Sequence, residues 1–153
     1  DLVSVIMSTY NNEKSIESSV NSILNQTYKN IEFLIIDDFS TDNTFGILNN
    51  LKNSDERIKV YRNSNNIGLT KSLNKLISKS KGAYIARQDA DDISLTYRIQ
   101  KQVNFLKEKK LDAVCARALT LQENKKIPRL TYETVHQTLL LVLPEDSMVK
   151  FDL

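Results

Sequence analysis

The sequence has 153 residues, of which 41% are hydrophobic and 26% are charged, and this composition is typical of one globular domain. The formal net charge of +2 is too small to indicate nucleic acid or a membrane surface as the main partner. Cys115 is the single cysteine, which excludes an intrachain disulfide, and no apolar run is long enough to cross a bilayer. We therefore expect a cytoplasmic protein, for which peripheral association with the inner face of the membrane stays open.

The first half of the chain alternates between short apolar runs and amphipathic segments. Residues 3–7 form a β-prone run that the polar residues 8–12 end, and residues 13–26 carry apolar side chains at helical spacing. The run 31–36 is almost entirely apolar, as in a strand that is covered on both faces of a parallel sheet. After a second helical segment, residues 58–61 predict a third strand.

The second half of the chain continues this alternation and then loses it. A helical stripe over 69–77 is followed by a β-prone run at 83–86, and residues 95–107 again show helical spacing. Residues 113–119 predict a fifth strand. Further on the pattern weakens, and the segment 132–143 has the spacing of an amphipathic helix.

Strands and helices that alternate at this spacing predict an α/β domain, with a mostly parallel central sheet flanked by helices and right-handed crossovers. Ligands of such sheets bind outside the carboxyl ends of the strands. Three of the predicted strand ends carry polar side chains, in residues 9–11, 37–38 and 89–92. We therefore expect these three segments to meet at one edge of the sheet.

The segment after the fourth predicted strand holds three carboxylates in four residues, Asp89, Asp91 and Asp92. Like charges this close repel each other unless a cation neutralises them, and oxygen ligands of this kind suit Mg²⁺ or Mn²⁺. The alternative is a solvated acidic turn that caps the helix starting at Leu95. Arg87, next to the loop, can pair with one of its carboxylates or with a phosphate.

Other polar residues at the strand ends are candidates for binding a nucleotide. Asp37 and Asp38 can accept hydrogen bonds from a base or a ribose hydroxyl, or can instead belong to a helix-capping turn. Thr9 and Tyr10 can supply a hydroxyl and a stacking ring, or can simply be the polar end of a strand. Lys71 can reach a diphosphate as a point charge, although most surface lysines have no such role.

Several blocks of this sequence, in this order, resemble family-2 inverting glycosyltransferases. The matching blocks are Val-Ser-Val-Ile-Met-Ser-Thr-Tyr-Asn at 3–11, Ser-Ile-Leu-Asn-Gln-Thr-Tyr at 22–28, Glu-Phe-Leu-Ile-Ile-Asp-Asp-Phe-Ser-Thr-Asp at 32–42, Asn-Ile-Gly-Leu at 66–69, Gly-Ala-Tyr-Ile-Ala at 82–86 and the DXD-type Asp-Ala-Asp-Asp at 89–92. The resemblance extends over about 3–119. It implies a GT-A fold, which is the Rossmann-like fold of nucleotide-diphospho-sugar transferases, with residues 1–120 as the nucleotide-sugar-binding core and 121–153 as a partial or divergent acceptor-side segment.

The resemblance also implies a reaction and a set of site residues. A sugar would move with inversion from a nucleotide-diphospho-sugar, often a UDP-sugar, to a hydroxyl of a saccharide or glycolipid acceptor, in polysaccharide or glycoconjugate biosynthesis. The cofactor would be Mn²⁺ or Mg²⁺. The implied contacts are those of Thr9, Tyr10 and Asp38 with the nucleoside, Lys71 with the nucleotide, Asp89 with the ribose or donor sugar, Asp91 with the metal, and Asp92 in support of the metal.

The general base that such a reaction needs has no convincing counterpart in the sequence. Glu145 and Asp146 form the only late acidic pair and are the weak candidates. The chain ends soon after the acidic loop, so we expect it to be truncated or to diverge in its last third.

Three other protein classes share some of these features, and a non-catalytic nucleotide-sugar-binding remnant stays open. A receiver domain of a two-component system has an acidic pair after its first strand, whereas Asp37 and Asp38 follow the second predicted strand. A haloacid-dehalogenase-like phosphatase carries its D-x-D loop after the first strand as well. A dinucleotide-binding oxidoreductase needs a glycine-rich first turn, and the sequence has only three glycines.

Overall fold

The structure is a computed structural model that describes residues 1–116 and 138–142. Six strands are present in these residues: β1 (Val3–Thr9), β2 (Ile31–Asp37), β3 (Ile58–Arg62), β4 (Tyr84–Arg87), β5 (Ala113–Ala116) and β6 (Thr138–Val142). Four helices connect them: α1 (Ile16–Leu24), α2 (Thr44–Ser54), α3 (Leu69–Ile77) and α4 (Arg98–Lys109). The predicted alternation of strands and helices is confirmed over the part that the structure describes.

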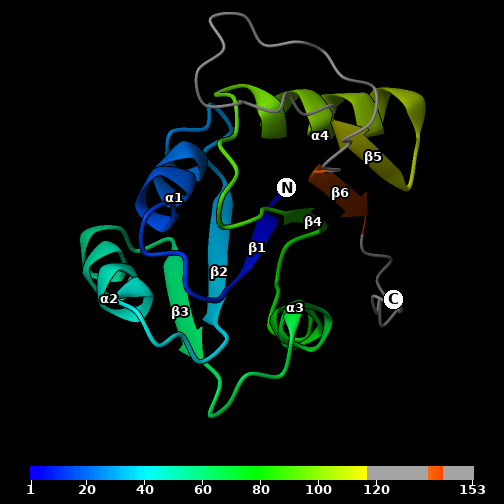
Figure 1. Cartoon of the computed structure of the whole chain (residues 1–153). Coiled ribbons are helices and arrows are strands. Elements are labelled where there is room, and N and C mark those ends of the chain that lie inside the picture. Colours follow the sequence, from blue (N-terminus) through cyan, green and yellow to red (C-terminus); the bar gives the residue numbers. More distant parts are fainter. Residues whose placement is uncertain (117–137, 143–153) are drawn as a thin grey trace, which may run out of the picture.

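The six strands form one sheet in the order β3-β2-β1-β4-β6-β5 (Figure 1). β3, β2, β1 and β4 pair in parallel, while β6 is antiparallel to both of its neighbours. Five of the six strands therefore point in the same direction, and the prediction of a mostly parallel sheet is confirmed. A receiver domain has the order 2-1-3-4-5, so the observed order and the reversed β6 do not agree with that alternative.

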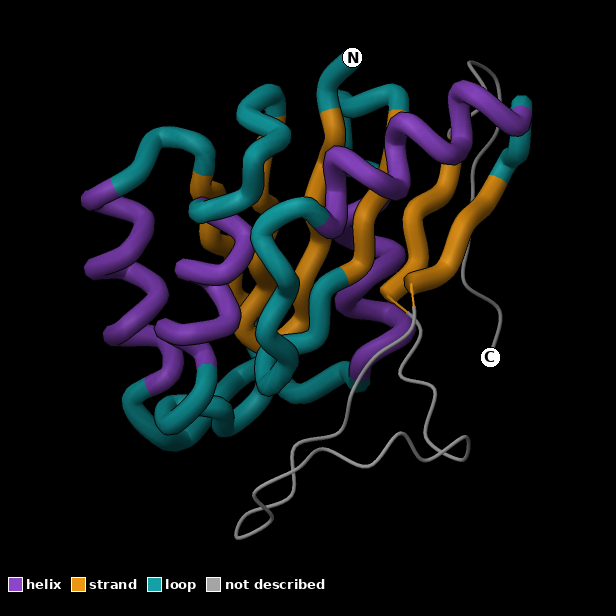
Figure 2. Tube along the Cα trace, turned by 90° about the horizontal axis from the view of Figure 1, so that it is seen from above, coloured by secondary structure: helices purple, strands orange, loops and turns teal. Residues whose placement is uncertain are grey.

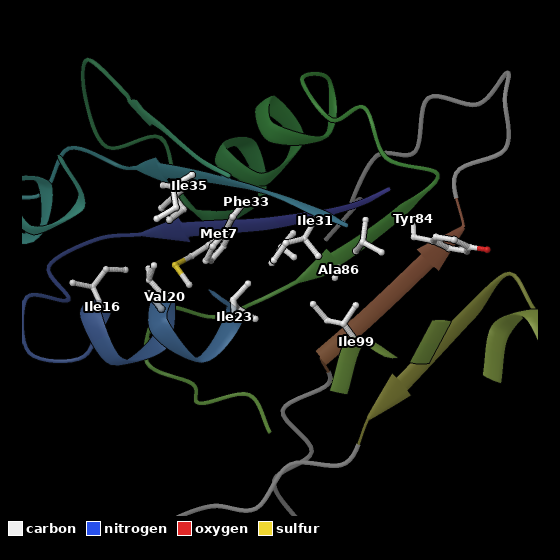
Figure 3. Packing of buried hydrophobic residues seen from close by; sticks show 14 of the residues in the cluster. Met7, Ile16, Val20, Ile23, Ile31, Phe33, Ile35, Tyr84, Ala86 and Ile99 are labelled. Atoms are coloured by element: carbon white, nitrogen blue, oxygen red, sulfur yellow. The ribbon is translucent and has the colours of Figure 1, made fainter. Parts of the chain in front are cut away.

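Helices cover both faces of the sheet, as the tube seen from above shows (Figure 2). The larger core lies under α1, α2 and α4, where Ile16, Val20 and Ile23 of α1 point toward strand side chains such as Met7 and Phe33 (Figure 3). The smaller core joins the opposite faces of β1, β2 and β4 to α3. Because both faces are covered, β2 is buried at all seven positions, which explains its almost unbroken apolar sequence.

The start of β4 lies very close to β1, and a glycine makes this approach possible. A Cβ added to Gly82 would come within 2.6 Å of the Ser4 amide nitrogen and within 2.7 Å of the Leu2 carbonyl oxygen. The Gly82 amide donates to Ser4 Oγ, which in turn donates to the buried Glu32 carboxylate. This network ties the amino-terminal edge of the sheet together, at the opposite end from the polar loops.

Two predicted elements differ from the observed ones. The helix expected over 132–143 is wrong for residues 138–142, which form β6 between β4 and β5. A short apolar run cannot be assigned to helix or strand from its spacing alone, and pairing with two strands decides it here. The helix expected from Leu95 begins instead at Arg98; residues 95–97 form an exposed turn, in which the carbonyl oxygens of 95 and 96 accept from Gln26 and Thr27.

Two further observations concern the late part of the chain and the membrane. β6 lies in the segment 121–153, which we predicted as acceptor-side, and it joins the central sheet between β4 and β5. The division of the chain at residue 120 stays a prediction. Across the residues that the structure describes, no helix combines the length and the apolar character needed to cross a bilayer.

Candidate functional site

The loops that follow β1 and β2 are joined by hydrogen bonds at the carboxyl edge of the sheet. Thr9 pairs with Asp37 at the strand ends, and the Asp38 amide donates to the Thr9 carbonyl oxygen at 2.8 Å. Beyond the strands, the Asn11 amide donates to Ser40 Oγ, and the Thr41 amide donates to Asn11 Oδ1. The two loops are therefore joined into one surface, on which Tyr10 is 46% exposed.

The Asp38 carboxylate is buried and is bound by the chain's own donors. Oδ1 accepts from Asn63 Nδ2 at 2.8 Å and from the Ile67 amide at 2.9 Å, and Oδ2 accepts from the Gly68 amide at 2.8 Å. Burial raises the pKa of Asp38, but these hydrogen bonds outweigh it and hold the pKa below its usual value. Asp38 therefore fixes the segment that leads into α3.

The Asp38 carboxylate also lies at the amino terminus of α3. Gly68 is the N-cap of this helix, has a φ of 86°, and makes no side-chain capping bond of its own. A carboxylate at this point is favoured by the positive end of the helix dipole. The sequence also allowed the aspartate pair to belong to a helix-capping turn with the residues that follow it. Asp37 does accept from the Ser40 amide at 3.2 Å, whereas the helix that Asp38 serves is α3, farther along the chain.

A second aromatic ring stands beside Asp38. Phe39 has a φ of 68°, which is uncommon for a bulky residue, and the residue is 45% exposed. Arg62 stacks on Phe39 and on Phe45, with 5.7 Å and 4.5 Å from the guanidinium carbon to the ring centroids. Arg62 Nε also pairs with the buried Asp37 carboxylate at 3.0 Å. The sequence analysis missed both Phe39 and Arg62.

The acidic loop follows β4 and is held against α1. β4 pairs in parallel with β1 as far as Ile6 and Arg87, so the loop leaves the sheet at the same edge as the other two. Ser19 Oγ donates to the Asp89 carbonyl oxygen at 2.9 Å, and the Ser94 amide donates to Ser22 Oγ at 3.0 Å. These bonds fix the backbone of the loop at both of its ends.

The three carboxylates of the loop differ in their surroundings. Asp89 is partly buried and forms a forked ion pair with Arg87, with Nε–Oδ1 at 2.9 Å and Nη2–Oδ2 at 3.2 Å. Pairing of Arg87 with a loop carboxylate, one of its two predicted roles, is thus observed. Asp91 is exposed, and Asp92 is partly buried. Asp91 is therefore the carboxylate of the loop that is most accessible to a ligand.

Two buried residues that the sequence analysis missed organise the acidic loop from inside. Gln88 is fully buried, and its Nε2 donates to the Asp92 carbonyl oxygen at 2.9 Å and to the Asp89 carbonyl oxygen at 3.2 Å. Its Oε1 accepts from Ser94 Oγ and from Arg98 Nη2. Burial lowers the pKa of Arg98 to about 10, and the charges of Asp92 and Asp89 act against this shift.

The sequence contains an indication that Arg98 is buried. The buried residues of α4 are Arg98, Ile99, Gln102, Val103 and Leu106, so the arginine lies on the apolar side of an otherwise polar helix. An ionisable side chain at such a position is buried only when neighbouring groups compensate its charge. Gln88 carries no comparable signal, because nothing in its neighbours in sequence shows that it is buried.

The remaining predicted site residues differ in their positions. Lys71 lies in the first turn of α3 and is exposed, close in sequence to the segment that Asp38 binds. Glu145 and Asp146 lie outside the described residues. Thr9 is buried, and its hydroxyl donates to Asn12 Oδ1 at 2.9 Å.

The donor set of the acidic loop fits a divalent ion that shares its ligands with a bound phosphate. Within residues 1–116 and 138–142, no three His, Cys, Asp or Glu side chains are grouped so that they could hold a metal ion by themselves. Mg²⁺ and similar ions commonly take one or two carboxylates together with waters and phosphate oxygens. Asp91 and Asp92 can supply such a partial set, whereas an all-protein metal cage does not fit.

The fold and the polar strand ends define a class of protein, the GT-A type glycosyltransferases. A structure of TarS from S. aureus in complex with UDP-GlcNAc superimposes with a TM-score of 0.77 at 23% identity, over 93% of this chain and 45% of that one. A mannosyltransferase from Pyrobaculum calidifontis in complex with GDP-Man and Mn²⁺ superimposes with a TM-score of 0.70 at 23% identity, over 76% of this chain and 35% of that one. At this identity the likeness establishes the fold alone.

Sequence comparison then places the chain within that class. The profile described as "Glycosyl transferase family 2" matches residues 4–148, and the chain belongs to this family. It is 47% identical over 107 residues to the putative glycosyltransferase EpsE of Bacillus subtilis, covering 69% of this chain and 38% of the relative. It is 41% identical over 111 residues to the Escherichia coli UDP-Glc:alpha-D-GlcNAc-diphosphoundecaprenol beta-1,3-glucosyltransferase WfaP, covering 72% of this chain and 43% of the relative.

A third relative matches almost the whole chain. The O-antigen biosynthesis glycosyltransferase WbnJ of Escherichia coli is 36% identical over 149 residues, which cover 94% of this chain and 57% of the relative. The chain thus spans only about 38–57% of the length of these three relatives. The family and the GT-A fold predicted from the sequence motifs are confirmed.

Proposed function

We propose that this chain is the donor-binding part of an inverting glycosyltransferase, which moves a sugar from a nucleotide-diphospho-sugar to an acceptor hydroxyl in polysaccharide or glycoconjugate biosynthesis. The observation that carries the proposal is the arrangement of the β1, β2 and β4 loops at one edge of a parallel sheet. Family membership and the nucleotide-sugar complexes of structural neighbours support it.

The nucleoside would bind at the joined β1 and β2 loops. Tyr10 offers an exposed ring for stacking on a base. The Asp38 carboxylate accepts hydrogen bonds from Asn63, Ile67 and Gly68, and Ser72 is a fourth donor to it, so Asp38 would serve nucleoside binding mainly by fixing the residues around it. We propose uridine as the nucleoside, on the grounds that relatives and neighbours include UDP-sugar proteins.

The diphosphate would lie between the acidic loop and Lys71. Asp91 and Asp92 are the residues that would hold Mn²⁺ or Mg²⁺, and Asp89 would approach the ribose or the donor sugar. A divalent ion held there would offset the charge that develops on the diphosphate as it leaves. Lys71 would add a mobile positive charge from the first turn of α3.

For the acceptor we propose only a chemical class, a saccharide or a glycolipid. Transfer with inversion is a single displacement, in which the hydroxyl of a saccharide or glycolipid attacks the anomeric carbon from the face opposite the diphosphate. A carboxylate within hydrogen-bond reach must take the proton of that hydroxyl. Glu145 and Asp146 remain the candidates for this base, and replacing each by its amide in an active protein would decide between them.

Calorimetric titration tests the donor proposal directly. The purified chain would be titrated with UDP, GDP, dTDP and the corresponding nucleotide-sugars, each in the presence of Mn²⁺ and in the presence of a chelator. We expect uridine nucleotides to bind most tightly, and only when Mn²⁺ is present. Equal binding in chelator would reject the metal site, and tighter binding of GDP or dTDP would reject the uridine assignment.

A further inference from the structure

The first residue of α4 is an arginine whose charge is buried. Arg98 is 9% exposed, and its guanidinium donates to the Arg87 carbonyl oxygen at 3.3 Å and to Gln88 Oε1 at 3.2 Å. Within the described part of the chain its Nε has no hydrogen-bond partner. Burying a guanidinium is costly unless nearby groups compensate the charge. The negative charges that act on it are those of Asp92 and Asp89, in the acidic loop.

Gln88 connects this buried charge to the backbone of the loop. Its side-chain oxygen accepts from Arg98, while its side-chain nitrogen donates to the carbonyl oxygens of Asp89 and Asp92. The Asp92 amide donates back to the Asp89 carbonyl oxygen at 3.2 Å, which closes a turn around Asp91. The exposed Asp91 therefore stands on a turn whose inner side is held by Gln88 and, through it, by Arg98.

The charges of this region nearly balance in the absence of any ligand. Asp89, Asp91 and Asp92 are negative, and Arg87 and Arg98 are positive. From the sequence we expected that the repulsion among the three carboxylates needs a bound cation. Arg87 forms an ion pair with Asp89, and the charges of Asp92 and Asp89 act on the buried Arg98, so part of this repulsion is offset before any cation binds.

We propose that Arg98 is a positioning residue, whose buried guanidinium acts through Gln88 as an internal counter-charge that holds the Asp89–Asp92 turn in one conformation before a metal or a diphosphate binds. The use of that turn for binding rests on the proposed function, but its conformation in the free protein does not. A site that is ordered in advance binds its ligand without the free-energy cost of ordering the loop.

Amide hydrogen exchange of the ligand-free protein, followed by NMR, tests the proposal. The Asp92 amide is hydrogen-bonded within the turn, the Ser94 amide is bonded to Ser22 of α1, and the Gln88 amide is bonded to Ile6 where the loop leaves the sheet; amides of β1 and β2 report on global unfolding. In Arg98→Met we expect the first three amides to exchange at least about 10-fold faster relative to the β1 and β2 amides. Arg98→Lys keeps the charge and should recover most of the protection.

Two more variants make the outcome decisive. Gln88→Met leaves Arg98 in place but removes its link to the loop, and it should also speed exchange at Asp92 and Ser94; it serves as the test if Arg98→Met does not fold. Arg57→Met, which removes another partly buried arginine paired with Asp55, should leave the three amides unchanged. Unchanged exchange in both Arg98→Met and Gln88→Met, or equal damage from Arg98→Lys and Arg98→Met, would overturn the counter-charge role.

Binding measurements separate this inference from the proposed function. If the turn is ordered in advance by Arg98, a folded Arg98→Met protein should bind UDP with Mn²⁺ about 10-fold more weakly than the wild type, because the ligand must then order the turn. Failure of the wild-type chain to bind UDP, GDP, dTDP or their nucleotide-sugars with Mn²⁺ would reject the proposed function and leave the exchange result intact. Wild-type affinity in Arg98→Met would reject the inference alone.

Discussion

The loops after β2 and β4 both carry neighbouring aspartates, but their carboxylates have different surroundings. Asp38, after β2, is 3% exposed and receives three hydrogen bonds from residues 63–68. Asp91, after β4, is exposed, and among the described residues its carboxylate receives no hydrogen bond. Asp38 therefore binds other parts of the protein, whereas Asp91 is accessible to a ligand.

This difference shows how similar acidic pairs can have separate roles in one site. A carboxylate that already receives several hydrogen bonds is fixed in position and stabilises the fold. A carboxylate that receives none keeps its full capacity for a cation. Structural and binding roles can therefore be separated by substitution, with folding stability and ligand affinity as two independent measurements.

The largest effect on stability is expected for Asp38→Asn. The new amide nitrogen would face the Gly68 amide or the Ile67 amide, so a donor would meet a donor inside the protein. We expect the free energy of unfolding to fall by about 2–4 kcal/mol, measured by urea denaturation. A loss below about 1 kcal/mol would mean that the hydrogen bonds of Asp38 contribute little to stability.

The next effect concerns ligand binding and is expected for Asp91→Asn. Its stability should remain within about 0.5 kcal/mol of the wild type, because the side chain is exposed. The affinity for UDP in the presence of Mn²⁺ should fall by about 10-fold or more, or about 1.4 kcal/mol, because a metal ligand is lost. Asp112→Asn is the matched control, since Asp112 is equally an exposed aspartate but lies at the amino end of β5. If Asp91→Asn and Asp112→Asn bind UDP with Mn²⁺ equally well, residues 89–92 are an acidic turn that binds no metal.

A smaller effect is expected on lowering the pH. The pKa of Asp38 is lower in the folded protein than in the unfolded chain, so its contribution to stability is present above about pH 3.9 and is lost as the pH falls through the folded pKa. Asp38→Asn has no carboxyl to protonate at this position. The stability difference between wild type and Asp38→Asn should therefore narrow from pH 7 to pH 3 in urea denaturation.

Glu32 also has a lowered pKa, and it provides an internal check of the pH experiment. Burial raises its pKa, but hydrogen bonds from Lys59 and Ser4 outweigh this effect. Glu32 is present in both proteins, so its contribution cancels in the difference. A difference that stays constant down to pH 3 would contradict the assigned cause of the Asp38 shift.

The smallest effect is expected for Lys71→Gln. Lys71 is exposed, and a single ion pair that water surrounds contributes little free energy to binding. We expect a loss of about 2–5-fold in affinity for UDP with Mn²⁺, which should shrink as the salt concentration rises. Lys52→Gln, on the exposed end of α2, is the control. A loss as large as that of Asp91→Asn would place Lys71 in direct contact with the diphosphate.

The sequence was sufficient to predict the parallel sheet and the edge at which the polar loops lie. Those predictions depend on apolar runs and on the alternation of strands with helices, which can be recognised along the sequence. The partners of Asp38 were not predictable in this way, because Ile67 and Gly68 reach it only after α3 packs on the sheet. The role of Arg98 depends on burial beside Gln88, and the strand at 138–142 depends on pairing with β4 and β5.

The position of β6 has a consequence for how the protein folds. β1, β2, β3 and β4 can assemble from neighbouring βαβ units in the order in which they are synthesised, but β5 has no strand to pair with until β6 arrives from a later part of the chain. Until then β4 presents an unpaired edge, the feature through which sheets join to other chains. A nascent chain that stops before Thr138 would therefore carry the complete β1, β2 and β4 loops on a sheet that is open to aggregation.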